Sequence, residues 1–335
     1  MKRYVLNAIG IDGLTIEDVP EPGRPGQGQV VVKMRAASLN YRDLMVTGGV
    51  YAGFAPGQVI LSDGAGEVVA VGDGVTRVKP GDRVALTFHI DWVGGALTPA
   101  HNVFGRGGGG NDGALQEQVC VSQNEVTRLP DHLSFEEGAT LPCAAVTAWS
   151  ALTAFAPLLP GQVVLTQGTG GVSIFAVQLA KLFGARVIAT SSSVEKLARL
   201  RALGADEVID YTKTPDWHLP VLEMTGGAGA DVVVEVGGKG TLQKSLLAAK
   251  PGGVVAIIGL LTGMPEVGAE ILLRCLNVHG VRVGSLEHFE QMNRAIAFHK
   301  MKPVIDRVFP FADAAAALRH LQGQKHVGKV VVRVD

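Results

Sequence analysis

The chain has 335 residues, and its 30 lysines and arginines nearly balance its 31 aspartates and glutamates. A net charge of −1 provides no field that would attract nucleic acid or a membrane, so we expect a small-molecule substrate. The apolar runs are much shorter than the ~20 residues that span a bilayer. The start of the chain has no secretory pattern, and three cysteines do not suggest a disulfide framework, which together favour a cytoplasmic protein.

A chain of this length exceeds the usual size of one hydrophobic core, so we expect two domains. Short strand-like runs separated by turns fill the first 125 residues, for example residues 29–35, 66–71 and 82–86. This part is predicted to be rich in β-structure. Residues 105–113 are mostly glycine and are predicted to form an exposed loop, because they have few side chains to pack.

The sequence period changes after Pro130. Ser134 and Glu137 form a capping-box pattern, and a helical stretch follows through residues 139–151. Strands and helices then alternate, and the expected strands are residues 163–167, 186–190, 207–210, 231–236, 254–258 and 278–284. Their nearly continuous apolar character is typical of a doubly wound parallel sheet that is covered on both faces. A helix at 287–300 and a strand at 329–334 follow, and the last strand is expected to rejoin the first domain.

A glycine turn joins the strand at 163–167 to the next helix and indicates a dinucleotide site. Gly168 allows a tight turn, Gly170 lets the backbone approach a pyrophosphate, and the helix N-terminus favours that anion. The residues expected to face the cofactor here are Gly168, Thr169, Gly170, Gly171 and Val172. The third glycine of the usual fingerprint is Ser173, whose hydroxyl either contacts the pyrophosphate or bonds back to its own helix; we expect the second.

Four stretches carry a family resemblance over nearly the whole chain: residues 36–44, 62–72 and 139–149, and the glycine turn with residues 203–206. The chain resembles the medium-chain dehydrogenases/reductases, and within them the zinc-free quinone oxidoreductase branch. The resemblance implies an α/β protein in which a GroES-like catalytic domain is interrupted by a Rossmann domain, with the active site in the cleft between them. We assign residues 1–125 and 287–335 to the GroES-like domain and residues 126–286 to the Rossmann NAD(P)-binding domain.

In the zinc enzymes of this family, the positions of Asn40, Ser62 and Cys143 hold the metal ligands. Here two of the three are poor zinc ligands, so we expect no catalytic zinc. Residues 89–113 contain no cysteine, so no structural zinc is expected either. We interpret His89 and His101 as ordinary hydrogen-bonding residues, and Cys143 as a packing residue in preference to a chemical one.

Asn40 and Tyr51 are the candidate catalytic residues. Asn40 stands in place of a zinc ligand, and Tyr51 follows a glycine turn. Tyr51 either donates a proton or hydrogen bond to the substrate or packs as a lid on its loop. Arg42 and Asp43 are interpreted as mainly structural.

The choice of cofactor depends on the end of the second Rossmann strand, where no acidic residue stands ready to bind ribose hydroxyls. Ser191, Ser192 and Lys196 suit a 2′-phosphate, so NADP(H) is favoured. NAD(H) is the alternative, because Glu195 could approach the ribose. A purely structural alternative makes residues 192–195 a capping box. The resemblance adds Tyr211 as a residue that lines the adenosine pocket.

The nicotinamide end should be held by glycine-containing loops at the carboxyl ends of later strands. The candidates are Val236, Gly237, Gly259, Leu260, Val283, Gly284 and Ser285, together with Thr147, one helical turn beyond Cys143.

Three functions remain open at this point. The favoured one is an NADPH-dependent, zinc-independent reductase of quinones or α,β-unsaturated carbonyl compounds. The second is an alcohol dehydrogenase with an altered metal site, which Cys143 would support. The third is a nucleotide-binding protein without enzymatic activity. The resemblance also implies a homodimer that pairs through the sixth Rossmann strand.

Overall fold

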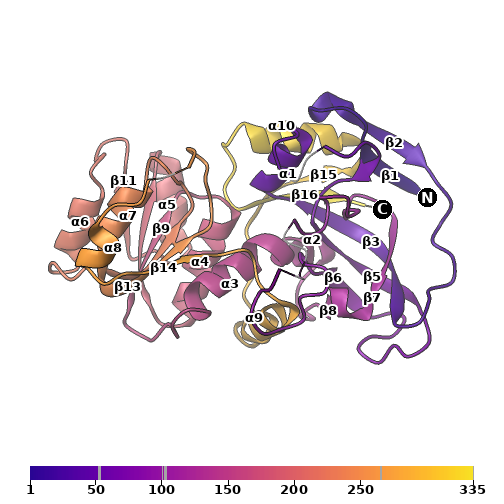
Figure 1. Ribbon diagram of the computed structural model, residues 1–335, viewed down its shortest axis with the longest axis horizontal. Helices are drawn as coiled ribbons and strands as arrows, with labels where there is room; N and C mark the ends of the chain where they lie inside the picture. The colour runs from indigo at the N-terminus through magenta and orange to yellow at the C-terminus, as the bar shows by residue number, and fades with distance from the viewer. Residues whose placement is uncertain (52–53, 100, 102–103, 265, 335) are drawn as a thin grey trace. The chain divides into compact units, whose positions relative to one another are not determined.

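The computed structural model describes residues 1–51, 54–99, 101, 104–264 and 266–334. The chain forms two compact units: Met1–Val146 with Val283–Asp335, and Thr147–Arg282 (Figure 1). The first unit is rich in β-strands and the second is built on a parallel sheet, so the predicted α/β class is confirmed. Within the described ranges, no helix is both long and apolar enough to cross a membrane.

The first unit holds two sheets and a few short helices. Its strands are β1 (Lys2–Leu6), β2 (Leu14–Asp18), β3 (Gln29–Leu39), β4 (Gln58–Val59), β5 (Asp63–Val71), β6 (Arg83–Leu86), β7 (Gln118–Ser122), β8 (Val126–Arg128), β15 (Ile305–Pro310) and β16 (Lys329–Arg333). Its helices are α1 (Tyr41–Thr47), α2 (Phe135–Ala139), α9 (Leu286–His299) and α10 (Ala314–Gln322), with the short turns η1 (Ile11–Gly13), η2 (Gln123–Glu125) and η4 (Phe311–Asp313).

The larger sheet of this unit has the order β15-β16-β3-β5-β6-β8, with β7 also paired to β3, and the smaller sheet has the order β2-β1-β4. The C-terminal strand β16 lies beside β3, as expected for a tail that returns to the first domain. Buried valines and leucines on both strands, such as Val30, Val32 and Val330, form the core.

Helix α2 begins where the capping box predicts: the Ser134 hydroxyl accepts the Glu137 N–H, and the Glu137 carboxylate accepts the Ser134 N–H. The predicted helical stretch through residues 139–151 is helical, but it is not one regular α-helix. A π-helical turn, η3 (Leu141–Ala145), separates α2 from α3 (Val146–Thr153). Pro142 has no N–H to continue a regular helix, and the wider turn is closed by a bond from the Val146 N–H to the Leu141 carbonyl.

The compact unit extends to Val146, beyond the expected boundary at residue 125, because α2 packs against β3 and β5. The predicted exposed loop at residues 105–113 is also wrong for its first half. Gly105 and Gly107 are buried. A side chain at Gly105 would collide with Phe88, and one at Gly107 with the backbone of Leu61. Glycine here allows close packing of the backbone, which the sequence pattern does not distinguish from exposure.

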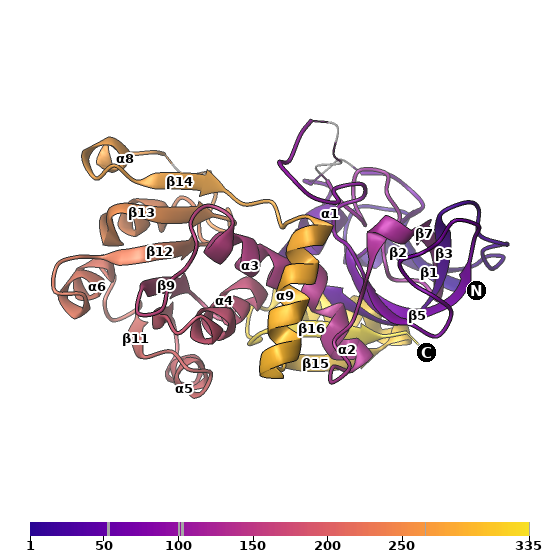
Figure 2. The ribbon, with the colours of Figure 1, turned by 90° about the horizontal axis from the view of Figure 1, so that it is seen from below.

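The second unit is a six-stranded parallel sheet with helices on both faces (Figure 2). Its strands are β9 (Val163–Gln167), β10 (Arg186–Ser191), β11 (Glu207–Asp210), β12 (Ala230–Glu235), β13 (Ala249–Ile257) and β14 (Asn277–Gly280). Its helices are α3, α4 (Gly171–Leu182), α5 (Val194–Ala202), α6 (His218–Met224), α7 (Leu242–Ala248) and α8 (Glu270–Leu273). The strand order β11-β10-β9-β12-β13-β14 reverses direction at β9 and β12, which is where doubly wound sheets bind their ligands.

The first five predicted strands of this sheet coincide with observed strands to within a few residues, because each is a buried apolar run between turns. The sixth, predicted at residues 278–284, ends at Gly280. Val283 has a φ of 61°, a left-handed backbone that a β-branched residue rarely adopts, so the strand cannot continue through it. Helix α9 begins one residue before the predicted position.

Candidate functional site

The glycine turn between β9 and α4 has the open geometry of an anion seat. Gly168 has a φ of 72°, and its N–H donates to the Thr190 carbonyl at 2.7 Å, which fixes the turn against β10. A Cβ atom at Gly168 or Gly170 would meet no atom within 4 Å, so the turn faces free space. Gly170 caps α4 without a side-chain acceptor, which leaves backbone N–H groups at the helix N-terminus for a ligand. These residues fit a pyrophosphate.

Ser173 lies in the first turn of α4, where its buried hydroxyl donates to the Gln167 carbonyl at 2.6 Å. The expected bond back to the helix is therefore wrong. The hydroxyl instead bonds the start of α4 to the end of β9. This bond holds helix and strand together where a glycine would let them pack in direct contact.

The residues predicted to hold the adenosine end lie together at the carboxyl ends of β10 and β11. The Tyr211 N–H donates to the Ser191 carbonyl at 3.1 Å, and Ser192 is exposed at the end of β10. The predicted capping box over residues 192–195 is wrong. Ser193 is the N-cap, and its hydroxyl accepts the Lys196 N–H at 3.3 Å.

Glu195 lies in the first turn of α5, where bonds from its own backbone N–H and from the Ser193 side chain lower the pKa of its carboxyl group. Glu195 is exposed on this first turn. Lys196 is half-buried one residue further along the same helix.

The glycine loops after β12 and β13 pack against each other. A Cβ at Gly259 would lie 2.2 Å from the Val236 carbonyl oxygen, and one at Gly238 would lie 3.0 Å from the Cα of Leu260. The Thr262 N–H and hydroxyl both donate to the Gly237 carbonyl, at 2.8 and 2.9 Å. These glycines are therefore required by contacts between two loops, whereas the sequence suggested that they clear space for a nicotinamide.

A buried carboxylate that sequence reasoning missed organises the first of these loops. Glu235 is fully buried at the end of β12 and accepts the N–H groups of Gly237 and Gly238 at 2.7 and 2.9 Å. Its carboxylate also accepts bonds from Gln167, Thr241 and Ser245. The acid was visible in the sequence at the end of a predicted strand, but the fold brings Gln167, 68 residues away, to it together with four donors from the following loop and helix.

The remaining predicted cofactor residues lie in the sequence next to the two points where the chain passes from one unit to the other. Thr147 is buried in the first turn of α3. Val283 and Gly284 belong to the first unit, as does Ser285, whose buried hydroxyl caps α9 by accepting the His288 N–H at 3.2 Å.

Asn40 lies in a buried polar cluster of the first unit, between β3 and α1. Lys329, only 2% exposed, donates from Nζ to the Leu39 carbonyl at 2.6 Å and to Oδ1 of Asn40. The same ammonium lies 3.7 Å from a carboxylate oxygen of Asp63, which is fully buried. The Asn40 amide nitrogen points the other way and donates to Oγ of Ser62 at 3.4 Å.

Asp63 collects the other polar groups of the cluster. It accepts the Ser62 hydroxyl at 2.7 Å and the Cys143 N–H, which the π-helical turn releases from the helix, at 3.2 Å. Leu61 precedes this pair with a φ of 67°, an uncommon conformation that aims Ser62 and Asp63 into the cluster. Burial, followed by the charge of Asp63, raises the pKa of the Cys143 thiol far above its usual range, so the thiol stays protonated at neutral pH.

Tyr51 lies over the guanidinium of Arg42, with the ring centroid 4.9 Å from Cζ, and makes an edge contact with Phe104. Arg42 donates to the Arg106 and Phe104 carbonyls at 3.0 Å and pairs with Asp43 at 3.2 Å. Asp43 in turn accepts the Asn40 N–H at 2.7 Å. Asn40 and Tyr51 are thus connected through Arg42 and Asp43, which supports the structural role predicted for that pair.

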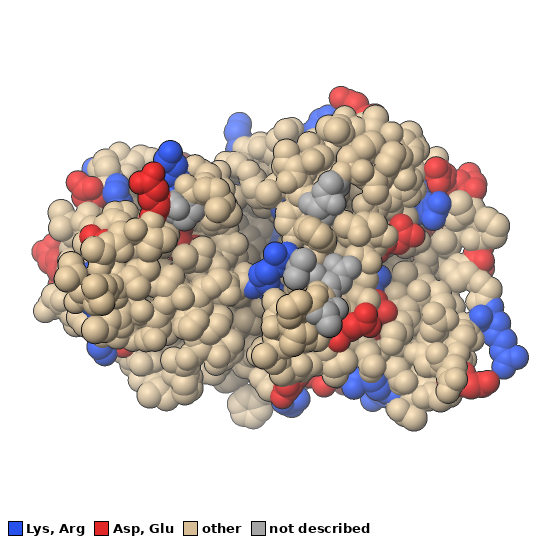
Figure 3. Space-filling model, in the orientation of Figure 1, with Lys and Arg blue, Asp and Glu red and all other residues tan. Residues whose placement is uncertain are grey.

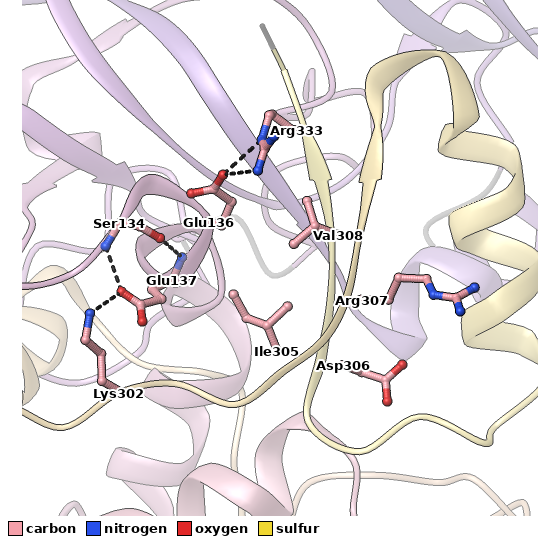
Figure 4. Close-up of a pocket in the computed structure, with 9 residues that line it drawn as sticks. All are labelled: Ser134, Glu136, Glu137, Lys302, Ile305, Asp306, Arg307, Val308 and Arg333. Atoms are coloured by element: carbon pink, nitrogen blue, oxygen red, sulfur yellow. Dashed lines mark hydrogen bonds and ion pairs between the residues drawn. The ribbon is translucent and has the colours of Figure 1, made fainter.

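A cavity of about 490 Å³ in the first unit shares no residue with the predicted site (Figure 4). Four of its six charged side chains form two ion pairs: Glu136 with Arg333 at 3.0 Å and Glu137 with Lys302 at 2.8 Å. Figure 4 shows these pairs along one wall, which leaves no convergent set of polar groups for a substrate.

A sheet that binds a dinucleotide and a β-rich unit with a buried polar cluster together define a nucleotide-dependent dehydrogenase or reductase. Residues 26–131 match the alcohol dehydrogenase GroES-like domain family, and residues 171–298 match the zinc-binding dehydrogenase family. The chain belongs to the medium-chain dehydrogenase/reductase superfamily, and it is an oxidoreductase of that family. The predicted family, GroES-like domain and Rossmann domain are confirmed.

Three similar proteins illustrate the range of the family. A zinc-type alcohol dehydrogenase-like protein of Schizosaccharomyces pombe is 40% identical, and the match covers 99% of each chain. A quinone oxidoreductase of Pseudomonas aeruginosa is 32% identical over 93% of each chain. The crystal structure of an NAD-dependent alcohol dehydrogenase is 36% identical with a TM-score of 0.91, and the match covers 100% of both chains.

Proposed function

We propose that this protein is an NADPH-dependent, zinc-independent reductase of quinones or α,β-unsaturated carbonyl compounds. The observation that carries the proposal is the polar cluster around Asn40. Of the three positions that hold zinc in related enzymes, one offers an amide, one a hydroxyl and one a protonated thiol. Zinc binds thiolates, imidazoles and carboxylates in a tetrahedron, so this donor set does not fit the ion.

A cation already lies beside these positions. The Lys329 ammonium bonds to Asn40 Oδ1 and is 3.7 Å from the carboxylate of Asp63. Bringing a divalent cation next to that buried ammonium would cost electrostatic free energy. Among the described residues, no three His, Cys, Asp or Glu side chains gather as a metal site.

The absence of a strong Lewis acid from the proposed mechanism determines the substrate class. Oxidation of a saturated alcohol needs a stabiliser for a localised alkoxide, which zinc supplies in other enzymes. In a quinone or an enone the developing negative charge spreads over the conjugated system, so neutral hydrogen-bond donors can stabilise it. We therefore propose that the Asn40 amide donates a hydrogen bond to the acceptor oxygen.

The cofactor, when bound, supplies the hydride. The N-terminus of α4 and the turn at Gly168–Gly170 would hold the pyrophosphate, and the loop at Val236–Gly238 would lie at the nicotinamide end. Ser191, Ser192 and Lys196 would hold the 2′-phosphate that distinguishes NADPH. Tyr51, fixed by Arg42, would donate a proton or a hydrogen bond to the reduced acceptor.

A panel of quinones, enones, aldehydes and alcohols, assayed with NADPH and NADH beside a zinc measurement, tests the proposal. We expect NADPH to be consumed with quinones or enones, at an unchanged rate after treatment with EDTA. Complete loss of activity on chelation, restored by zinc, would overturn the proposal.

An alcohol dehydrogenase with an altered metal site is the second candidate, because Cys143 retains one zinc-ligand residue and the S. pombe relative carries a zinc-type name. This function requires stoichiometric zinc in the purified protein and loss of alcohol oxidation in Cys143→Ala. We expect neither, since Asn40 and Ser62 occupy the other two ligand positions and Lys329 already bonds to Asn40.

We also propose that the protein forms a homodimer through β14, the last strand of the parallel sheet. Exposed apolar side chains lie next to this edge: Leu260, Leu261, Met264, Val267, Leu272 and Leu273 are 44–80% exposed. The face of the second unit seen in Figure 3 has few charged side chains. Such a surface next to an unpaired strand edge favours association.

Replacing Leu272 and Leu273 with glutamate should convert a dimer to a monomer in light scattering. Phe298→Glu, which changes an equally exposed apolar residue on α9, is the matched control. A wild-type protein that is monomeric at high concentration would contradict the proposal.

We propose a cytoplasmic location on the evidence of the thiols. All three cysteines, Cys120, Cys143 and Cys275, are free, as is usual in a reducing compartment.

A further inference from the structure

The buried lysine at the start of β16 has a role that the family resemblance did not suggest. Lys329 is 2% exposed, and burying an ammonium is costly unless it is paired and hydrogen-bonded. It donates to the Leu39 carbonyl, donates to Asn40 Oδ1 and lies 3.7 Å from Asp63. Two of these three partners, the Leu39 carbonyl and the Asn40 side chain, belong to consecutive residues at the end of β3.

An ammonium group has three donors and no acceptor, whereas a side-chain amide presents an acceptor at one end and two donors at the other. The amide oxygen of Asn40 must therefore face Lys329, and the NH₂ group must face away from it. This orientation follows from the chemistry of the pair.

The nitrogen end of the Asn40 amide faces Ser62 and Asp63. Its nitrogen bonds to the Ser62 oxygen at 3.4 Å, and the Ser62 hydroxyl hydrogen is already donated to Asp63. A bond from the Asn40 side chain also partly offsets the rise in the pKa of the buried Asp63 carboxyl group, so both Ser62 and Asp63 accept from this amide. Asn40 is only half-buried and its bond to Ser62 is long, so a substrate oxygen that reaches the amide nitrogen can replace Ser62 as the acceptor.

We propose that Lys329 is a positioning residue: by holding the Asn40 carbonyl oxygen, it keeps the amide N–H directed at the oxygen of the substrate. This inference rests on the proposed role of Asn40 as the donor to a quinone or enone. Without Lys329, the amide could rotate and present its oxygen, which would repel the developing negative charge on the acceptor.

The test replaces Lys329 with methionine, which keeps the length of the side chain and removes its donors. Because loss of the ammonium leaves the Asp63 carboxylate buried without its cation, each variant is made with and without Asp63→Asn. We expect Lys329→Met to lower kcat with the acceptor about 10- to 100-fold relative to its matched parent, with the Kd for NADPH unchanged. Lys329→Arg, which also only donates, should retain most of the activity.

A double-mutant cycle separates positioning from general damage. In an Asn40→Ala background, Lys329→Met should lower kcat by less than about threefold, because the group that it positions is gone. Lys302→Met, which removes an exposed lysine paired with Glu137, is the matched control and should leave kcat unchanged. An equal loss of activity with and without Asn40 would overturn the proposal.

A second readout does not depend on activity. In protein labelled with ¹⁵N-asparagine, the side-chain amide signals of Asn40, assigned by their loss in Asn40→Ala, should shift or broaden in the Asp63→Asn, Lys329→Met variant but not in Asp63→Asn alone. Unchanged signals would overturn the role of Lys329 whatever the substrate is. A wild-type enzyme that reduces no quinone or enone would overturn the proposed function alone, since these signals would still decide the role of Lys329.

Discussion

Gln167 and Glu235 are bonded to each other across the parallel sheet: Nε2 of Gln167 donates to a carboxylate oxygen of Glu235 at 2.8 Å, and both side chains are buried. The two residues end the neighbouring strands β9 and β12. Gln167 immediately precedes the glycine turn, and Glu235 holds the N–H groups of Gly237 and Gly238. The pair therefore fixes the two loops that we assign to opposite ends of the cofactor.

Replacing Glu235 with glutamine should lower the free energy of unfolding by about 2–3 kcal/mol, because an NH₂ group would then face buried donors that the carboxylate now accepts. Urea denaturation measures the change. Binding of NADPH should also weaken, since the loop after β12 loses an anchor. Glu223→Gln, on an exposed position of α6 in the same unit, is the control and should change neither quantity.

Ser173→Ala distinguishes the observed role of this residue from a contact with the cofactor. The hydroxyl donates to the Gln167 carbonyl in a buried setting, so its removal should cost about 1 kcal/mol of stability. The Kd for NADPH, measured by fluorescence titration, should change by less than about threefold. A tenfold or greater loss of affinity at unchanged stability would instead indicate that Ser173 contacts the pyrophosphate.

The sequence predicted the second unit well because its strands are apolar runs between turns and its ligand-binding turn has a fixed glycine pattern. The prediction failed where one local sequence pattern is compatible with two different structures. The glycines at 105 and 107 allow a buried backbone to pack, although the same residues would be typical of an exposed loop. The helix through residues 139–151 kept its apolar period, but Pro142 forces the wider turn.

The candidate site was predicted in its parts but not in its connections. Asn40 and Tyr51 could be named from the resemblance, whereas Lys329 begins a strand 289 residues away in the chain and was not among the predicted site residues. The only sequence signal was a lysine at the start of a strand that is expected to be buried. Which of many lysines is drawn into a core depends on tertiary pairing, and no local pattern encodes it.

Lys196→Glu tests the choice of cofactor. Lys196 is on the first turn of α5, next to the end of β10, where we propose that the 2′-phosphate binds. Replacing its positive charge should weaken NADPH binding about 100-fold and NADH binding by less than about threefold, because only NADPH carries the phosphate. Arg201→Glu makes the same change of charge on an exposed position of the same helix. Equal effects of Lys196→Glu on both nucleotides would refute the assignment.

Asp43 makes the stability of the protein depend on pH in an unusual direction. Its side chain is 1% exposed, and burial raises the pKa of its carboxyl group to about 6, against the opposing effects of Arg42 and of the Asn40 N–H. In the unfolded chain the pKa would be about 3.9. Between these two values the folded protein binds the extra proton, so this group stabilises the fold most below pH 4, and the contribution is lost as the pH rises through 6.

The expected size follows from the two pKa values. Between pH 5 and pH 7, Asp43 should lower the free energy of unfolding by about 1 kcal/mol. Urea denaturation at both pH values should show that difference between wild type and Asp43→Asn, whose side chain cannot titrate. Asp73→Asn, at an exposed turn of the same unit, should follow the wild type. Parallel curves for wild type and Asp43→Asn would mean that Asp43 is ionised throughout this range, held so by the guanidinium of Arg42.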